Sequence, residues 1–200
     1  GLITPEGTLT FEFGRARLDE DSTPTIETIF EIGSITKVFT ALLLAQMVSE
    51  GLVTLETPIS ELLPDDFVFA NPEVGSITLE QLATHTSGLP RMPTNFSTRD
   101  STDPYADYDR DALFEYLQTA DLEERRYRYS NLGVGLLGTL LAQRLGMTYG
   151  EAIRERVTAP LAMSDTTTHE HSEVHLRRLA QTTNADLDPV PIWSFDTLVG

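Results

Sequence analysis

The sequence of 200 residues contains no cysteine, which excludes a disulfide framework, a thiol nucleophile and a thiolate metal site. Basic residues are scarce, because 14 Lys and Arg stand against 31 Asp and Glu and give a formal net charge of −17. A negative field of this size repels phosphate backbones and anionic lipid, so no nucleic-acid partner is expected. The longest apolar stretch, Leu132 to Ala142, is about half of what a bilayer crossing needs, so no membrane span is predicted. The first residues do not form a basic-then-apolar segment, so we expect that any export signal has been removed or never existed.

The composition is otherwise that of a folded protein. Hydrophobic residues make up 40 % and charged residues 22 % of the chain, which excludes the disordered and collagen-like classes. A length of 200 residues fits one domain and suffices for a substantial core.

Lysine is nearly absent, since 13 of the 14 basic residues are arginine and Lys37 is the only lysine. Arginine is a permanent cation, whereas lysine can lose its proton in a tuned environment. Lys37 is therefore a candidate for a residue that takes part in catalysis. The alternative is a codon bias against lysine that left one lysine in the chain.

Ser34 stands three residues before Lys37, at the start of a helix predicted from Ile35 to Glu50. Residues three apart share one face of a helix, so the amine can reach the hydroxyl. The positive end of the helix dipole favours an alkoxide on Ser34 and a neutral amine on Lys37. The alternative is that Ser34 caps the helix and Lys37 is a surface residue.

Tyr129-Ser130-Asn131 precedes a strongly apolar predicted helix, Leu132 to Leu145. A tyrosine close to a lysine can share or lose its proton, and Asn131 offers a donor and an acceptor to a substrate amide. In isolation, the same residues also fit a buried tyrosine followed by Asn131 as the helix N-cap.

Other patterns predict a strand after a turn, then a mostly helical body. The strand is predicted at Thr8–Gly14. The helices are predicted at Glu56–Leu63, at Thr78–His85 with a capping box, at Asp111–Ala120, at Tyr149–Val157 and at Val174–Gln181, and residues 91–109 form a long loop.

Ser34-x-x-Lys37, followed about 95 residues later by Tyr129-x-Asn131, resembles the serine β-lactamase and penicillin-binding-protein superfamily. The similarity is to its class C β-lactamase, D-alanyl-D-alanine carboxypeptidase and esterase branch. Further matching stretches are Phe30 to Thr40, Leu82-Ala83-Thr84-His85-Thr86-Ser87-Gly88-Leu89-Pro90 and Pro160-Leu161-Ala162-Met163-Ser164-Asp165-Thr166.

The resemblance implies an α+β fold of the β-lactamase/transpeptidase type. We expect N-terminal strands of an antiparallel sheet plus a largely helical subdomain, with the closing C-terminal strands absent from this chain. Within a single, incomplete domain over 1–200, residues 1–55 would hold strands and the nucleophile helix, 56–165 the helical part and 166–200 a return segment.

The resemblance also implies an acyl-enzyme hydrolase without a cofactor. Ser34 would be the nucleophile, with its backbone N–H as one oxyanion donor. Lys37 and Tyr129 would share the acid and base work, and Asn131 would contact the substrate. The partner would be a small-molecule or peptide substrate, namely a β-lactam, a D-Ala-D-Ala peptide or a short-chain ester, and the location periplasmic or secreted in a bacterium rather than cytoplasmic.

The chain departs from the family pattern in its third motif, because it contains no Lys-Thr-Gly or His-x-Gly triplet. We therefore expect the 200 residues to be the first part of a longer family member, and the isolated chain to be unstable or to be completed by a second chain or a swapped copy. Glu123-Glu124-Arg125-Arg126 replaces a usual Pro-Gly turn, and Ala162 replaces a usual glycine. The alternative function is a non-catalytic or slowly acylating binding or sensing module.

The histidines give weaker signals. His169, His171 and His175 form a polar cluster without a third confident ligand, so a solvated loop is preferred to zinc and no metal is expected. His85 lies before Thr86-Ser87-Gly88 and is expected to order that loop rather than to pair with a serine. No Gly-x-Ser-x-Gly occurs, which argues against an α/β-hydrolase elbow.

Overall fold

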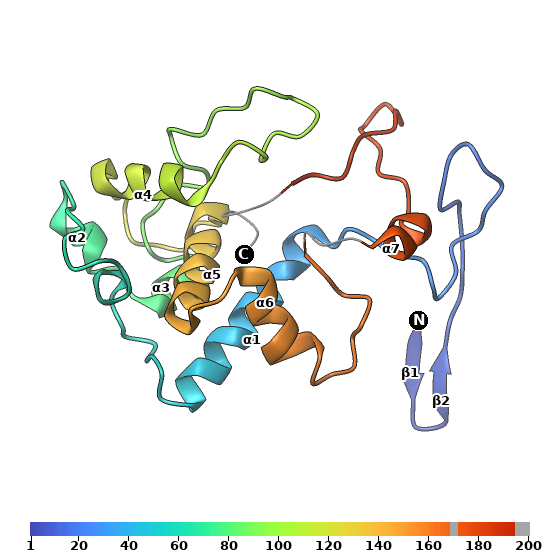
Figure 1. The fold of residues 1–200 in the computed structure, drawn as a ribbon, viewed down its shortest axis with the longest axis horizontal. Coiled ribbons are helices and arrows are strands. Elements are labelled where there is room, and N and C mark those ends of the chain that lie inside the picture. Colours follow the sequence, from blue (N-terminus) through green and yellow to red (C-terminus); the bar gives the residue numbers. More distant parts are fainter. Residues whose placement is uncertain (169–171, 195–200) are drawn as a thin grey trace. The chain divides into compact units, whose positions relative to one another are not determined.

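The computed structural model describes residues 1–168 and 172–194. The chain divides into two compact units, one formed by Gly1–Ile32 with Glu170–Ile192 and the other by Gly33–His169 with Trp193–Gly200. Figure 1 shows the ribbon and labels the α-helices and the two strands. Within the described residues, no helix has the length and apolar character that would let it cross a membrane.

The larger unit is helical. Its elements are η1 (Gly33–Ile35), α1 (Thr36–Ser49), η2 (Ile59–Leu62), α2 (Pro72–Gly75), α3 (Leu79–Ala83), α4 (Arg110–Thr119), α5 (Asn131–Leu145), α6 (Tyr149–Ile153) and the π-helix η3 (Arg154–Thr158). Helix α1 packs against α5 and α6, and α3 packs against α5.

Helix α5 is the centre of the core. It is apolar on every side, which is typical of a helix enclosed by others, and ten of its residues are buried. Leucines from the surrounding helices pack in the same cluster, namely Leu43 and Leu44 of α1, Leu79 and Leu82 of α3, and Leu113 and Leu117 of α4. This core fixes the two chain segments that carry the candidate site, which are the start of α1 and the residues before α5.

The smaller unit contains an antiparallel strand pair and one short helix. Strands β1 (Leu2–Thr4) and β2 (Gly7–Leu9) pair with Leu2 opposite Leu9, and the helix is α7 (Glu173–Arg178). A short parallel bridge joins Ile29 to Leu179 and links the N-terminal segment to the return segment. None of the described residues of this unit is buried.

The elements confirm the predicted α+β class, with differences in several elements. The helix predicted at Glu56–Leu63 is only the 3-10 helix η2, because Pro58 is extended and the helical turn begins after it. The helix predicted at Val174–Gln181 ends at Arg178, because Leu179 is extended and bridges Ile29. The strand predicted over Thr8–Gly14 ends at Leu9, because Leu9 pairs with Leu2 and no described residue continues the ladder beyond it. The N-cap of α5 is Ser130 and not Asn131, since the Ser130 hydroxyl accepts the N–H of Gly133. The capping box predicted at Thr78 is confirmed, with both reciprocal bonds to Gln81 present.

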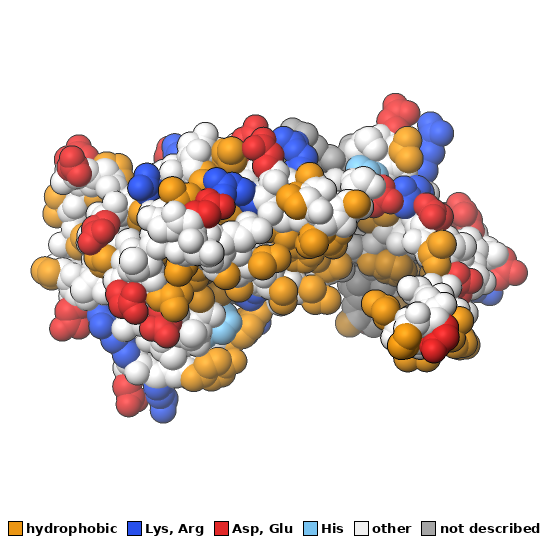
Figure 2. Space-filling model, turned by 90° about the horizontal axis from the view of Figure 1, so that it is seen from below, with side chains coloured by type: hydrophobic (Ala, Val, Ile, Leu, Met, Phe, Trp, Pro, Cys, Tyr) orange, Lys and Arg blue, Asp and Glu red, His pale blue; other side chains and the backbone are white. Residues whose placement is uncertain are grey.

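Exposed apolar side chains are numerous. On α1 and directly before it, Ile35, Val38 and Leu42 are 60 %, 65 % and 39 % exposed, at helical spacing along one stripe. Figure 2 shows apolar side chains over much of one face, with acidic groups between them.

Candidate active site

Ser34 lies in η1, and Lys37 lies in the first turn of α1. The Ser34 side chain is exposed and Lys37 is half-buried. The Lys37 Nζ donates a long hydrogen bond of 3.5 Å to the Ser34 Oγ. The N-cap of α1 is Ile35, and no side chain caps this helix, so capping does not occupy the Ser34 hydroxyl.

The residues before α5 bring Tyr129 to the same place. The Tyr129 hydroxyl donates a hydrogen bond of 2.7 Å to the Ser34 Oγ, across a separation of 95 residues in the chain. The Lys37 Nζ lies 5.3 Å from the centre of the Tyr129 ring. Serine, lysine and tyrosine thus form one contiguous group of donors and acceptors.

The surroundings of Tyr129 favour its ionised form. Burial raises the pKa of the phenol, but hydrogen bonding with Ser34 and Lys37 and the charges of Lys37 and Arg91 outweigh burial and lower the pKa below its ordinary value. A phenol with a lowered pKa can exchange a proton with a hydroxyl at hydrogen-bond distance.

His85 holds the Tyr129 segment on both sides. Its carbonyl accepts the N–H of Arg128 at 2.8 Å, and its Nδ1 accepts the N–H of Ser130 at 3.1 Å. Its ring lies 4.6 Å from the Tyr129 ring. His85 thus orders the segment around Tyr129, and its expected role in the loop Thr86-Ser87-Gly88 stays a prediction.

The contacts of His85 require a neutral imidazole. Because Nδ1 accepts a hydrogen bond, the ring carries its proton on Nε2. Burial and the charge of Lys37 lower the pKa of His85, which favours this form. The φ of +60° places this non-glycine residue in the left-handed region, a conformation that the surrounding contacts must stabilise.

Asn131 is the first residue of α5 and is half-buried. Its Nδ2 contacts the sulfur of Met92 at 3.8 Å, and its backbone N–H donates to the Arg91 carbonyl. Ser130, between Tyr129 and Asn131, is only 1 % exposed, and its hydroxyl also donates to the Pro90 carbonyl. The segment from Pro90 to Met92 therefore lies directly against the start of α5.

Sequence reasoning missed two residues of this site. Ser130 could have been found as the serine that precedes an apolar helix, which is an N-cap signal. No sequence pattern pointed to Arg91. Its guanidinium lies 5.1 Å from the centre of the Tyr129 ring because of the path of the loop that carries it, which the sequence does not reveal.

The described residues hold no group of three or more His, Cys, Asp or Glu side chains that could hold a metal ion. His175 lies on α7, whereas His169 and His171 lie outside the described residues.

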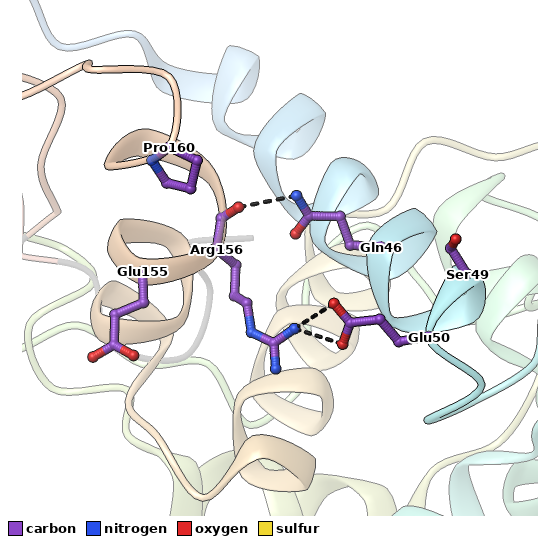
Figure 3. Close-up of a pocket in the computed structure, with 6 residues that line it drawn as sticks. All are labelled: Gln46, Ser49, Glu50, Glu155, Arg156 and Pro160. Carbon is purple, nitrogen blue, oxygen red and sulfur yellow. Dashed lines mark hydrogen bonds and ion pairs between the residues drawn. The ribbon is translucent and has the colours of Figure 1, made fainter.

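A shallow pocket of about 290 Å³ lies elsewhere, where the last turns of α1 meet η3. Its lining residues are Gln46, Ser49, Glu50, Glu155, Arg156 and Pro160 (Figure 3). Arg156 pairs with both carboxylate oxygens of Glu50, at 2.7 and 2.6 Å, and its carbonyl accepts a bond from Gln46. Ser34 precedes the opposite end of α1, roughly 20 Å away at 1.5 Å per residue, so this pocket is not part of the candidate site.

The family model described as Beta-lactamase matches residues 3–196. The chain belongs to the beta-lactamase family. The predicted family is thereby confirmed, and the order of Ser34, Lys37, Tyr129 and Asn131 in the chain is the order on which the resemblance was based.

Members of the beta-lactamase family resemble the chain in sequence. It is 32 % identical over 158 residues to a D-alanyl-D-alanine-carboxypeptidase/endopeptidase of Escherichia coli (strain K12), which spans 78 % of this chain and 40 % of that protein. It is 34 % identical over 146 residues to a beta-lactamase of Providencia stuartii, which spans 71 % of this chain and 34 % of that protein. Both names describe hydrolases.

Solved structures of the family share the fold. A beta-lactamase/D-alanine carboxypeptidase of Yersinia pestis superposes with a TM-score of 0.79 at 26 % identity, over 94 % of this chain and 53 % of that one. A class C beta lactamase of Rhodobacter sphaeroides gives a TM-score of 0.72 at 27 % identity, over 91 % and 49 % of the two chains. The chain thus spans about half the length of these structures and about two fifths or less of the curated relatives named above.

Proposed function

We propose that this chain supplies the nucleophile and the acid–base groups of a serine hydrolase that cleaves an amide or an ester through an acyl-enzyme. Ser34 is the nucleophile, Lys37 and Tyr129 share the acid and base work, and Asn131 contacts the substrate. The observation that carries the proposal is the 2.7 Å hydrogen bond between the Tyr129 hydroxyl and the Ser34 Oγ, with the Lys37 Nζ 3.5 Å from the same oxygen.

The reaction follows from these contacts. With Tyr129 ionised, the phenolate accepts the Ser34 proton while the Ser34 Oγ bonds to the substrate carbonyl carbon. The carbon–nitrogen or carbon–oxygen bond then breaks, and the proton held by Tyr129 passes to the leaving group. Water, deprotonated by the same residues, attacks the acyl-enzyme and releases the acid, and Ser34 recovers its proton.

The names of the relatives indicate candidate classes of substrate. Their names include a D-alanyl-D-alanine carboxypeptidase and beta-lactamases, so a D-Ala-D-Ala peptide and a β-lactam are candidates beside a short-chain ester. All three present a carbonyl carbon to a serine nucleophile, and the residues of this site act on that carbon alone.

A second candidate function rests on the absence of a Lys-Thr-Gly or His-x-Gly triplet in the 200 residues. Removing a single oxyanion donor typically costs about 10²–10³ in rate. A chain that acylates Ser34 without fast hydrolysis would be a binding or sensing module rather than an enzyme with turnover.

One experiment separates these functions. The chain is incubated with a fluorophosphonate or a β-lactam and the adduct is mapped by mass spectrometry, while turnover is followed with nitrocefin and a p-nitrophenyl ester. An adduct on Ser34 with sustained turnover supports the enzyme, and an adduct alone supports the module. No adduct on Ser34 contradicts both functions.

Three variants control this experiment. Ser34→Ala must abolish the adduct and the turnover, whereas Ser49→Ala changes an exposed serine at the other end of the same helix and must leave both intact. Lys37→Arg keeps the positive charge but removes a group that can lose its proton, so a large loss of acylation is expected.

The prediction that a second chain or a swapped copy completes the fold stays a prediction. The exposed stripe of Ile35, directly before α1, with Val38 and Leu42 of α1 is one apolar surface that such a partner would cover. Analytical ultracentrifugation tests the prediction, and a well-folded monomer that melts cooperatively would contradict it.

A further inference from the structure

Arg91 places a second cation beside the candidate acid–base group. Its guanidinium carbon lies 5.1 Å from the centre of the Tyr129 ring, at nearly the same distance as the Lys37 Nζ at 5.3 Å. Among the described residues, no carboxylate lies within ion-pair distance of Arg91.

The main chain of Arg91 is fixed to the same segment. Its carbonyl accepts the N–H of Asn131 at 3.0 Å and the N–H of Leu132 at 3.2 Å. These two donors belong to the first turn of α5, whose N–H groups have no partner within the helix. The guanidinium is therefore attached to a backbone that cannot move independently of Tyr129, two residues before Asn131.

We propose that Arg91 is a positioning residue that acts through Tyr129, because its guanidinium stabilises the negative charge on the phenol oxygen while the proton of Ser34 is transferred. This inference rests on the proposed function, in which Tyr129 exchanges a proton with Ser34.

The choice of arginine fits this role. A guanidinium stays protonated over the whole range in which a phenol or a lysine amine titrates, so its charge is constant while theirs change. Its planar group also stacks over an aromatic ring, which a point charge does less well. The charge of Arg91 is one of the contributions that lower the pKa of Tyr129.

The other charged and titratable groups around Tyr129 come from several neighbouring elements. Lys37 comes from α1 and His85 follows α3, while Arg128 of the same segment is paired with the Glu123 carboxylate. Arg91 is thus the cation that comes from the loop after His85, and it can be changed without altering the serine and lysine pair.

The test compares three variants of the whole chain. Arg91→Gln removes the charge and leaves the backbone carbonyl in place, and Arg91→Lys returns a charge without the planar group. Arg144→Gln is the matched control, because Arg144 is an exposed arginine in the last turn of α5, roughly 20 Å along the helix from its first residue.

Two readouts are needed. The first is the ionisation midpoint of the Tyr129 phenol, followed by NMR of the chain labelled with ¹³C at the tyrosine Cζ, with Tyr129→Phe to assign the signal among six tyrosines. The second is the pH profile of Ser34 acylation by a p-nitrophenyl ester, followed by mass spectrometry of the adduct.

We expect Arg91→Gln to raise the Tyr129 midpoint and to move the acid limb of the acylation profile to higher pH. At a pH on that limb the acylation rate falls about two- to fivefold, which is the range of an exposed cation–π contact. Arg91→Lys restores most of the rate, and Arg144→Gln changes neither readout.

Different results overturn different claims. An adduct that forms in every variant with the same midpoint and the same profile overturns the role of Arg91 alone. A lower rate with an unchanged profile, not restored by Arg91→Lys, also overturns it, because that result describes a structural role. No adduct on Ser34 in the unaltered chain overturns the proposed function and this inference with it.

Discussion

Replacement of Ser130 by alanine should destabilise the larger unit and slow acylation together. The Ser130 hydroxyl accepts the N–H of Gly133 at 2.8 Å and donates to the Pro90 carbonyl at 2.7 Å, in a residue that is 1 % exposed. Loss of an N-cap hydroxyl costs about 0.5–2 kcal/mol. The carbonyl of the half-buried Pro90 also loses its donor, and leaving a buried acceptor without a partner costs about 1–3 kcal/mol more. We expect Ser130→Ala to lower the free energy of unfolding by about 1.5–5 kcal/mol.

Thr148 provides the matched control for this substitution. Its hydroxyl also caps a helix, accepting the N–H of Glu151 at 3.2 Å and donating to the Glu151 carboxylate at 2.9 Å. Thr148 is exposed, so water can replace both bonds in Thr148→Ala. The expected loss is at the lower end for a cap, about 0.5–1 kcal/mol.

Urea unfolding followed by far-ultraviolet circular dichroism measures both variants under the same conditions. The acylation rate is measured in native buffer, where Ser130→Ala should be slower because Tyr129 and Asn131 flank the lost cap, and Thr148→Ala should be unchanged. If the two variants lose the same stability within about 0.5 kcal/mol, burial and the Pro90 bond do not set the energy of this cap. The reasoning about Ser130 would then be refuted.

Two further predictions concern the chain around His85. Gly88 has a φ of +82°, and a Cβ built there lies 2.7 Å from the Glu123 carbonyl oxygen, whereas Gly146 has a φ of +68° with no atom within 4 Å of its Cβ. Gly146→Ala should cost about 1–2 kcal/mol from its backbone conformation alone, and Gly88→Ala about 1–3 kcal/mol more, measured by urea unfolding. The pKa of His85 lies below its ordinary value of 6.5, because burial and the charge of Lys37 disfavour the protonated ring. The unfolded chain therefore binds the proton more readily, so stability is full above pH 6.5 and falls as the pH decreases below it. Urea midpoints measured at several pH values should fall less steeply with decreasing pH in His85→Gln than in the unaltered chain. Equal slopes in both chains would contradict the conclusion that His85 is neutral in the folded chain.

The sequence predicted the parts of this fold that local patterns determine. The capping box of Thr78 and Gln81 and the uniformly apolar run of α5 depend on neighbours in the chain, so they were visible without a structure. The strand predicted to Gly14 was too long, because a strand lasts only as far as its partner, and pairing depends on residues elsewhere in the chain.

The candidate site shows the same division. The spacing of Ser34 and Lys37 within one helical turn can be read from the sequence, since it needs only helix geometry. The contact between Tyr129 and Ser34 needs the packing of α1 against α5, and the sequence offered it only through the resemblance to a family. Arg91 lay beyond both kinds of reasoning, because the path of an irregular loop follows from many weak contacts.

The contacts around Tyr129 lie within the larger unit, so this unit builds the geometry of the candidate site. Tyr129 is held by His85 on both sides, through the His85 carbonyl and the His85 Nδ1, and the next two residues are hydrogen-bonded to the carbonyls of Pro90 and Arg91. Every one of these bonds runs between the loop after α3 and the start of α5, and both helices are anchored in the buried core. The position of the phenol is thus coupled to the stability of that core, so substitutions that loosen the start of α5 should weaken acylation even where they touch neither Ser34 nor Lys37.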